Sequence, residues 1–198
     1  MGLWEAAMTT PATLDTPLRL FFEKLEPLAT ATPDMARIAT LLVELSRDGD
    51  YFAHHIAAAP ANGARPLHVP AEGPCLQLVH RPEGVMGAVH SHSVWVAVAP
   101  VTGTETHRRF DVTKRRADGH APLELAEERH LDADSGDSTT LTPPNDVHQH
   151  GHVTGYGDAA YVLILTGQKQ QKFERQEYDL KQGTWRRLAP GDAGRWVE

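Results

Sequence analysis

The pattern of apolar residues changes once along the chain, at Ala61-Asn62-Gly63, and this change constrains the fold most strongly. Before it, apolar residues recur at the three- and four-residue steps of amphipathic helices. After it, short alternating or apolar runs are separated by Gly, Pro, Asn and Asp, which is typical of an antiparallel sandwich or barrel. The sequence therefore predicts a mainly β domain behind two or three helices.

Three helices are predicted before residue 61. The spacing of apolar residues predicts the first over residues 17–28. Thr32-Pro33-Asp34 predicts the start of the second, with Thr32 as the N-cap and proline at the first helical position, and Arg47-Asp48-Gly49 predicts its end. Asp50 is the predicted cap of a short third helix that ends before Pro60.

Nine strands are predicted in the second part of the chain. They cover residues 75–80, 87–98, 104–110, 122–129, 138–141, 147–153, 160–166, 168–178 and 184–188. The polar segments 114–120 and 131–137 are predicted surface loops. We expect one domain overall, with a flexible arm over residues 1–16, helices over 17–60 and the β-barrel over 61–198.

The composition argues against several classes of partner. Lys and Arg number 19 against 26 Asp and Glu, so the net charge of -7 lacks the basic balance of a nucleic-acid binder, and a small-molecule ligand is expected instead. No apolar run is long enough to span a bilayer, and the N-terminus lacks the layout of a signal peptide. Cys75 is the single cysteine, which excludes an internal disulfide framework. We therefore expect a cytoplasmic protein without a membrane partner.

Histidines form two candidate metal-binding groups among the 12 in the chain. His90 and His92 alternate with other residues on a predicted strand, so their side chains point to the same face and can meet one ion. His148 follows the tight turn 143–146 on a distant strand. Neighbouring antiparallel strands bring such distant positions together, so His148 is a candidate third ligand.

Two further histidines follow His148 on the same predicted strand. His150 and His152 share its face if the strand is regular, and either could be the third ligand or a proton relay behind the metal. Gly151 could break the alternation with a bulge. Spacing alone leaves these alternatives open.

The spacing of these residues resembles that of the cupin family. Gly84, His90-x-His92 and Gly103 look like the first cupin motif, and Pro143-x-Asn145-x-x-His148 looks like the second, with Asn where Gly is usual. The resemblance implies a cupin jelly-roll β-sandwich with a metal held by His90, His92 and His148. It leaves His150 and His152 as rim residues, and cupins often form homodimers.

One departure from the motif narrows the resemblance. The glutamate ligand of many cupins would fall at Val96, which cannot bind metal, so three histidines are expected. A three-histidine cupin with N-terminal helices resembles the thiol dioxygenases, the group of cysteine dioxygenase and 3-mercaptopropionate dioxygenase. That resemblance implies an Fe(II) cofactor and the addition of O2 to a small thiol, with a thiol carboxylate giving a sulfinate. Imidazole ligands by themselves also suit Zn, Cu and Ni.

Candidate substrate-binding residues lie outside the histidine motifs. A guanidinium would hold a substrate carboxylate by paired hydrogen bonds. Arg65 precedes His90 by about the interval found for the carboxylate-binding arginine of cysteine dioxygenases, and Arg81 is a nearer alternative. Tyr161 and Trp95 are candidates for the pocket lining, and either could equally be a core aromatic.

The resemblance to thiol dioxygenases is incomplete downstream of His148. Their Ser-x-His-x-Tyr run would fall on Tyr161-Val-Leu163-Ile-Leu165, which is apolar at the His and Tyr positions. An apolar wall at Leu163 and Leu165 favours a second hypothesis, a three-histidine oxygenase for a non-thiol substrate. A third hypothesis is a non-catalytic cupin that holds zinc.

Overall fold

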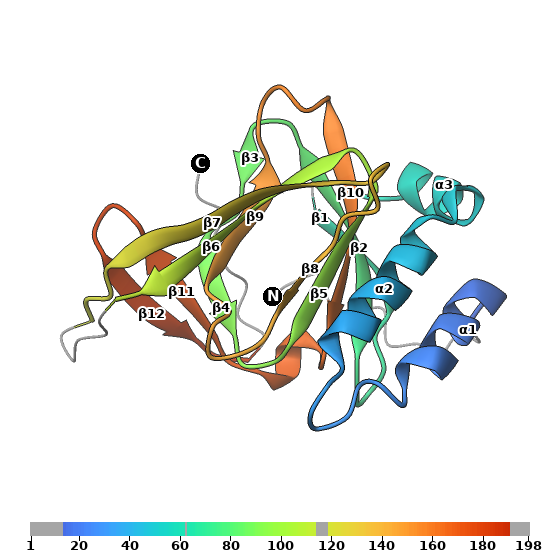
Figure 1. Cartoon of the computed structure of the whole chain (residues 1–198), viewed down its shortest axis with the longest axis horizontal. Helices are drawn as coiled ribbons and strands as arrows, with labels where there is room; N and C mark the ends of the chain where they lie inside the picture. The colour runs from blue at the N-terminus through green and yellow to red at the C-terminus, as the bar shows by residue number, and fades with distance from the viewer. Residues whose placement is uncertain (1–13, 62, 114–118, 191–198) are drawn as a thin grey trace, which may run out of the picture.

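The structure is a computed structural model that describes residues 14–61, 63–113 and 119–190. Helices come first in the chain, and strands fill the rest (Figure 1). The helices are α1 (Thr16–Leu25), α2 (Met35–Ser46), α3 (Gly49–Ala57) and the 3-10 helix η2 (Gln170–Lys172). The strands are β1 (Gly63–His68), β2 (Cys75–Pro82), β3 (Val85–Met86), β4 (Val89–His92), β5 (Val96–Thr102), β6 (Thr104–Val112), β7 (Leu123–Asp132), β8 (Thr139–Leu141), β9 (His148–His152), β10 (Ala159–Thr166), β11 (Arg175–Asp179) and β12 (Thr184–Leu188).

The strands form two antiparallel sheets that face each other (Figure 1). The first sheet has the order β1-β2-β10-β5-β8, and the second has the order β12-β11-β4-β9-β6-β7, with β3 paired to β9. Several neighbours in these orders, such as β2 and β10 or β4 and β9, are distant in sequence, as in a jelly roll rather than a meander. The predicted mainly β sandwich with N-terminal helices is confirmed.

Aspartates cap all three N-terminal helices. The carboxylates of Asp15, Asp34 and Asp48 accept hydrogen bonds from backbone N–H groups in the first turns of α1, α2 and α3. The predicted caps Thr32 and Asp50 are therefore wrong by two residues each. A short carboxylate reaches the N–H three residues on, and Asp34 and Asp48 stand in that position.

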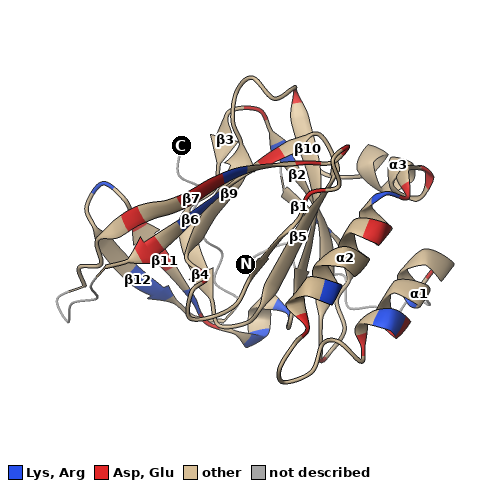
Figure 2. Ribbon diagram, viewed as in Figure 1, with Lys and Arg blue, Asp and Glu red and all other residues tan. Residues whose placement is uncertain are grey.

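Charged residues concentrate along the edge strand β7 and its neighbour β6, as Figure 2 shows. Arg108 lies opposite Glu128, and Arg109 lies opposite Glu127, in the antiparallel pairing. Such charges on an exposed edge discourage pairing with another chain. Among the described residues, no helix combines the length and apolar character needed to cross a membrane.

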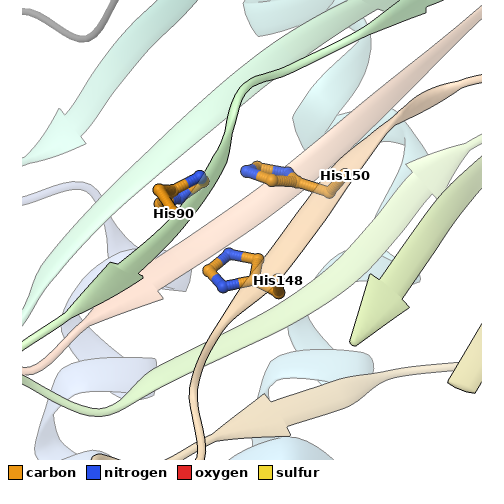
Figure 3. A group of neighbouring side chains, drawn as sticks. All are labelled: His90, His148 and His150. Carbon is orange, nitrogen blue, oxygen red and sulfur yellow. The ribbon is translucent and has the colours of Figure 1, made fainter. Parts of the chain in front are cut away.

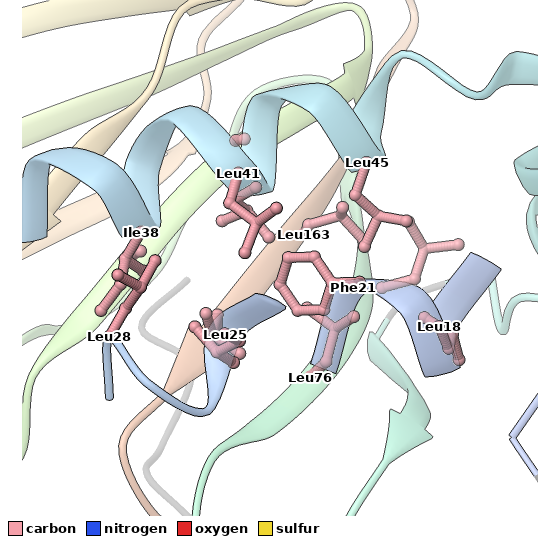
Figure 4. Packing of buried hydrophobic residues seen from close by; sticks show 14 of the residues in the cluster. Leu18, Phe21, Leu25, Leu28, Ile38, Leu41, Leu45, Leu76 and Leu163 are labelled. Atoms are coloured by element: carbon pink, nitrogen blue, oxygen red, sulfur yellow. The ribbon is translucent and has the colours of Figure 1, made fainter. Parts of the chain in front are cut away.

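Two of the three apolar clusters among the described residues flank the first sheet as layers, and the third lies on the second sheet around Val89, Phe110 and Tyr178. The larger lies between the helices and the outer face of the first sheet (Figure 4), and it includes Leu18, Phe21, Leu25, Ile38, Leu42, Leu76, Leu78, Leu163 and Leu165. The smaller lies between the sheets and includes Val96, Val98, Leu131, Leu141, Ala160 and Val162. Alternate residues of β10 thus face opposite layers, because side chains alternate along a strand.

Several predicted strands are corrected by the structure. The predicted strand 87–98 divides at residues 93–95, because β4 belongs to the second sheet and β5 to the first. The predicted strand 168–178 holds η2 before β11, and β1 and β3 were not predicted. Leu131, predicted to lie in a loop, is fully buried at the end of β7.

Two glycines stand where a Cβ would collide with the backbone of a neighbouring segment. Gly103 has a φ of 69°, and a Cβ there would lie 2.5 Å from the carbonyl oxygen of Ala159. A Cβ on Gly151 would lie 2.3 Å from the carbonyl oxygen of Val85, so β3 approaches β9 closely. The ladder between β6 and β9 continues through Gly151 in register, so this glycine allows the close approach and no bulge forms.

Some predictions fall outside the described residues. Most of the predicted arm, 1–16, lies there, and α1 already begins at Thr16. Residues 114–118 of the predicted loop 114–120 also lie outside. The division of the chain into arm, helices and barrel stays a prediction.

Candidate metal centre

Three histidines from two neighbouring strands point toward one another between the sheets (Figure 3). His90 lies directly opposite His148 in the pairing of β4 with β9. Regular alternation along β9 places His150 on the same face as His148. We call His90, His148 and His150 the histidine trio. One ring nitrogen from each lies within 4.8 Å of those of the other two.

Backbone carbonyls orient two rings of the trio. The Nδ1 atom of His90 lies 2.9 Å from the carbonyl oxygen of Ala88, and that of His148 lies 2.8 Å from the carbonyl oxygen of Asp146. Only a protonated nitrogen can donate to a carbonyl, so the proton of a neutral ring is held at Nδ1. The lone pair is then at Nε2, which is the usual arrangement of a metal-binding histidine.

A buried ion pair lies behind the third histidine. Arg81 Nε donates to Glu105 Oε1 at 3.2 Å, and this oxygen lies 3.0 Å from His150 Nδ1. Arg81 Nη2 lies 2.6 Å from the same ring nitrogen. Arg81 is 4% exposed and Glu105 is 0% exposed, so the pair joins β2 of one sheet to β6 of the other inside the sandwich.

His92 lies beside the trio but outside the closest group. Its ring centroid is 4.8 Å from that of His90 and 5.3 Å from that of His148. Its backbone N–H donates to the Asp146 carboxylate at 2.6 Å. Its buried Nδ1 has no hydrogen-bond partner in the described part of the chain. The ring centroid of His150, which was expected to be a rim residue, is no closer, at 5.4 Å from that of His90 and 5.2 Å from that of His148. It is the ring nitrogens that group the predicted ligands His90 and His148 with His150 rather than with His92.

His107 is a fifth histidine of this interior, and the sequence analysis missed it. Its ring lies parallel to that of His148 at 5.2 Å, and the residue is 4% exposed. Its Nε2 has no partner among the described residues, and neither has Glu105 Oε2. Glu105 and His107 stand two apart on the predicted strand 104–110, a signal that they share a face, but only the pairing of β6 with β9 reveals which face.

Burial keeps these imidazoles neutral. It lowers the pKa well below the ordinary imidazole value in the whole trio and in His92. Burial also lowers the pKa of His107 to about 4, although the carboxylate of Glu105 opposes this effect. The neutral form carries the lone pair that a metal requires. A nitrogen-rich site ready for a divalent cation therefore exists near neutral pH.

The two predicted arginines occupy different sides of the first sheet. Arg81 reaches the trio, as described above. Arg65 Nε donates to His55 Nδ1, and its Nη1 donates to the carbonyl oxygen of Ala58, each at 3.3 Å. These contacts place Arg65 on the helix side, away from the trio.

Tyr161 also lies on the helix side. It packs against the larger apolar layer and stacks on His80 with ring centroids 4.8 Å apart. Leu163 and Leu165 belong to that same layer. The expected apolar wall at these two leucines therefore does not face the histidines. The residues of β10 that face the interior are Ala160, Val162 and Ile164, which are also apolar.

His152 ends the histidine series in a structural position. Its Nδ1 lies 2.6 Å from the carbonyl oxygen of Thr104, and its Nε2 lies 2.7 Å from that of Gly157. Both nitrogens are thus engaged by the backbone, and the ring ties β6 to the turn before β10.

One cationic side chain near the site was not predicted. Arg175 lies directly opposite His92 in the pairing of β4 with β11, so the two side chains share a face of the sheet. Its positive charge adds to the lowering of the pKa of His90 and His92. These effects place the Arg175 guanidinium near the β4 side of the trio.

The residues present fit a nitrogen-binding metal. Neutral imidazoles suit Fe(II), Zn, Cu and Ni, whereas a site for Mg²⁺ or Ca²⁺ would need oxygen ligands. The unpartnered ring nitrogens of His92 and His107 are buried polar atoms of the kind that an ion or water satisfies. The donor set identifies a candidate metal centre without selecting among these metals.

No protein-family model and no curated protein matches the chain. Solved structures do show similarity. One is the capsular polysaccharide assembling protein CapF from Staphylococcus aureus, with 15% identity and a TM-score of 0.43 over 66% of this chain and 33% of that chain. This chain thus spans about a third of the length of CapF.

Two further structural neighbours are smaller proteins. An uncharacterized conserved protein with a double-stranded beta-helix domain from Klebsiella pneumoniae has 14% identity and a TM-score of 0.43 over 64% of this chain and 91% of that chain. A cupin protein from Bacteroides fragilis has 16% identity and a TM-score of 0.40 over 56% and 80%. Structural neighbours are thus cupin proteins, but at such low TM-scores the fold assignment rests on the sheet order of this chain.

Proposed function

We propose that this protein is an Fe(II)-dependent cupin dioxygenase that adds O2 to a small organic thiol, with a thiol carboxylate as substrate and a sulfinate as product. The observation that carries the proposal is the convergence between the sheets of three imidazoles that shielding from water keeps neutral. The choice of iron and of a thiol rests on the resemblance of the His-x-His and Pro-x-Asn-x-x-His motifs to those of thiol dioxygenases.

His90, His148 and His150 are the proposed metal ligands. His90 and His148 agree with the sequence motifs, and the closeness of His150 supports it as the third ligand in place of His92. Three protein ligands would leave coordination positions open for substrate and O2, and a bound iron would supply activation of O2 and a lowered thiol pKa. The chain itself orients the substrate and excludes water.

We propose Arg175 as the residue that attracts a substrate carboxylate. Arg81 is engaged with Glu105 and His150, and Arg65 lies on the helix side. Arg175 lies opposite His92, on the face of β11 that adjoins the trio. A guanidinium there can hold a carboxylate beside the metal by charge-assisted hydrogen bonds.

Oxygen consumption tests the proposal. Protein loaded anaerobically with Fe(II) is mixed with a panel of small thiols, with and without a carboxylate, in an oxygen electrode. We expect uptake with at least one thiol and none above background with the His90→Ala variant. Uptake equal to that of the variant across the whole panel would contradict the proposal.

A zinc-holding cupin is the second candidate, because three imidazoles and a water also make a zinc site. Elemental analysis of the freshly purified protein separates the two. Stoichiometric zinc without oxygen uptake after iron loading would favour this candidate. Leu163 and Leu165 pack against the helices, but the β10 residues that face the interior are apolar as well, so an oxygenase for a non-thiol substrate stays a hypothesis.

A further inference from the structure

We propose that Glu105, held by Arg81, is the positioning residue that makes His150 a metal ligand and thereby selects the trio over the set that contains His92. This inference rests on the proposed metal-dependent function and concerns how the chain chooses its ligands. Nothing in the sequence motifs points to Glu105, which lies on β6, outside both of them.

The contacts around His150 Nδ1 allow two exclusive arrangements. Nδ1 lies 3.0 Å from Glu105 Oε1 and 2.6 Å from Arg81 Nη2. A guanidinium only donates, and an ionised carboxylate only accepts. Nδ1 of a neutral ring therefore either donates its proton to Glu105 or accepts one from Arg81.

Each arrangement has a different consequence at the opposite ring nitrogen. With the proton at Nδ1 and donated to Glu105, Nε2 carries the lone pair and can bind the metal that His90 and His148 also bind. With Nδ1 accepting from Arg81, Nε2 carries the proton and cannot be a ligand. The metal would then need His92 as its third imidazole. Metal binding selects the arrangement in which Glu105 accepts.

Glu105 is built to act in this way. Its side chain is fully buried, and Arg81 Nε fixes Oε1 at 3.2 Å, so the carboxylate cannot swing away into water. The salt bridge links the two sheets, which holds the carboxylate beside β9. His92 has no such orienting acceptor, since its Nδ1 lacks a partner in the described residues. The three trio members each have an acceptor at Nδ1, and His92 does not.

The first test titrates Co(II) into metal-free protein and follows the visible absorption, whose bands report the ligand set. The variant Arg81→Met/Glu105→Leu removes both charges together, because replacing a buried ion pair by apolar residues is often tolerated, whereas removing one partner strands the other. We expect about 10- to 100-fold weaker Co(II) binding, as for loss of other orienting partners of metal ligands. Arg81→Met/Glu105→Gln also removes both charges but retains a carbonyl oxygen that can accept from Nδ1, and it should recover most of the affinity.

The coupling to His150 is tested by a mutant cycle. His150→Ala should weaken Co(II) binding in the wild-type background and change it by no more than about two-fold in the Arg81→Met/Glu105→Leu background. His92→Ala should change it by no more than about two-fold in the wild type. Full additivity of the His150 and Glu105 changes, or loss of binding through His92→Ala alone, would overturn the inference.

A matched control exists on the same sheet. Arg108, Glu128 and His130 form a similar arginine–glutamate–histidine group that is half-exposed. Arg108→Met/Glu128→Leu should leave Co(II) affinity unchanged. Circular dichroism of each variant reports whether it folds.

A second measurement needs no variant. Nitrogen-15 NMR of zinc-loaded wild-type protein identifies which imidazole nitrogens carry protons. We expect His150 to be protonated at Nδ1 and metal-bound at Nε2, and a proton at Nε2 would refute the inference. Neither measurement uses oxygen chemistry, so the protein can fail as a thiol dioxygenase and still bear out the role of Glu105, or the reverse.

Discussion

Single side chains decide the chemistry of this interior, because each imidazole there is desolvated and has few partners. His90 and His148 are oriented by backbone carbonyls, whereas His150 depends on a carboxylate and a guanidinium. The contacts of His90 and His148 with backbone carbonyls persist as long as the backbone keeps its conformation there. A side-chain contact can be removed by mutation or rearranged, so His150 is the adjustable member of the trio.

At His148, substitution by Ala should abolish stoichiometric metal binding, since this ring is the centre of the cluster and is 1% exposed. We expect at least about ten-fold weaker binding of Co(II) or Fe(II), because losing even a residue that only orients a metal ligand has an effect of this size. The secondary structure should be retained. Metal analysis after dialysis and a Co(II) titration measure this. His54→Ala, on the helical segment, is the control and should bind metal as the wild type does. Equal metal content in the two variants would contradict the assigned ligand.

Acid should destabilise the metal-free protein through these same histidines. Their folded-state pKa values are lowered, so below about pH 6.5 the unfolded chain binds protons that the folded chain refuses. Stability is therefore lost as the pH falls from about 6.5 toward 4, where His107 itself protonates. Its shift alone corresponds to a loss on the order of 3 kcal/mol. Burial raises the pKa of Glu105, so this group opposes the trend. Above its ordinary pKa, the contribution of Glu105 to stability falls as the pH rises.

Urea unfolding of the metal-free protein at a series of pH values measures this slope. His107→Leu should show a shallower decline between pH 6.5 and 4, because one of the suppressed protonation steps is gone. Loading with metal at pH 7 should raise the stability by mass action. A stability that is constant over this pH range would contradict the assigned neutral state of the cluster.

At the scale of the elements, the close approach of β3 to β9 controls where the histidines of β9 sit. A Cβ on Gly151 would meet the carbonyl oxygen of Val85 at 2.3 Å and the Cα of Met86 at 2.7 Å. These are backbone atoms, so the strands would have to separate. The register of His148 and His150 against β4 and β6 depends on this contact.

Gly151→Ala should therefore reduce both stability and metal affinity. We expect a loss of about 1–3 kcal/mol in the free energy of unfolding, as for other overpacked positions, and weaker Co(II) binding. Gly49→Ala is the matched control, because a Cβ there meets nothing within 4 Å and alanine favours the helix. Chemical unfolding and Co(II) titration of both variants measure the effect. A Gly151→Ala protein as stable as Gly49→Ala would contradict the close approach.

At the scale of the whole molecule, the helices stabilise the sandwich from outside without forming the site. Residues of α1 and α2 pack on Leu76, Leu78, Leu163 and Leu165, which project from the first sheet away from the histidines. The metal centre lies on the other side of that sheet. Stability and metal binding should thus be separable.

Leu163→Ala tests this separation. Removing a fully buried leucine side chain should cost about 2–5 kcal/mol of unfolding free energy. Co(II) affinity at a temperature where the variant is folded should stay within about two-fold of the wild type, because the residue touches the helix layer. Thermal unfolding and Co(II) titration measure the two quantities. A large loss of affinity in a folded variant would place Leu163 in the site.

Local patterns were enough to predict the helical segment before the strands and an antiparallel sandwich or barrel after it, because the spacing of apolar residues along a helix or strand specifies these directly. The jelly roll and the choice of His148 as a partner of His90 came instead from the resemblance of two motifs to those of cupins. Element ends were less accurate: Thr32 and Asp50 have side chains that can cap a helix, but the N–H groups of Arg37 and Tyr51 in the first turns donate to Asp34 and Asp48 instead.

Which side chains reach the histidines was determined by the pairing of strands that are distant in the sequence. Arg65 and Arg81 both precede His90 at plausible distances, but strand alternation and the position of the helices send one outward and bring the other inside. Leu163 is apolar in either case, and only the packing shows that it faces the helices. Glu105 and His107 belong to no motif, and they reach the histidines because β6 pairs with β9. The order of residues determined which side chains share a face of a helix or strand, and only the pairing of distant strands brought the histidines of the candidate metal centre together.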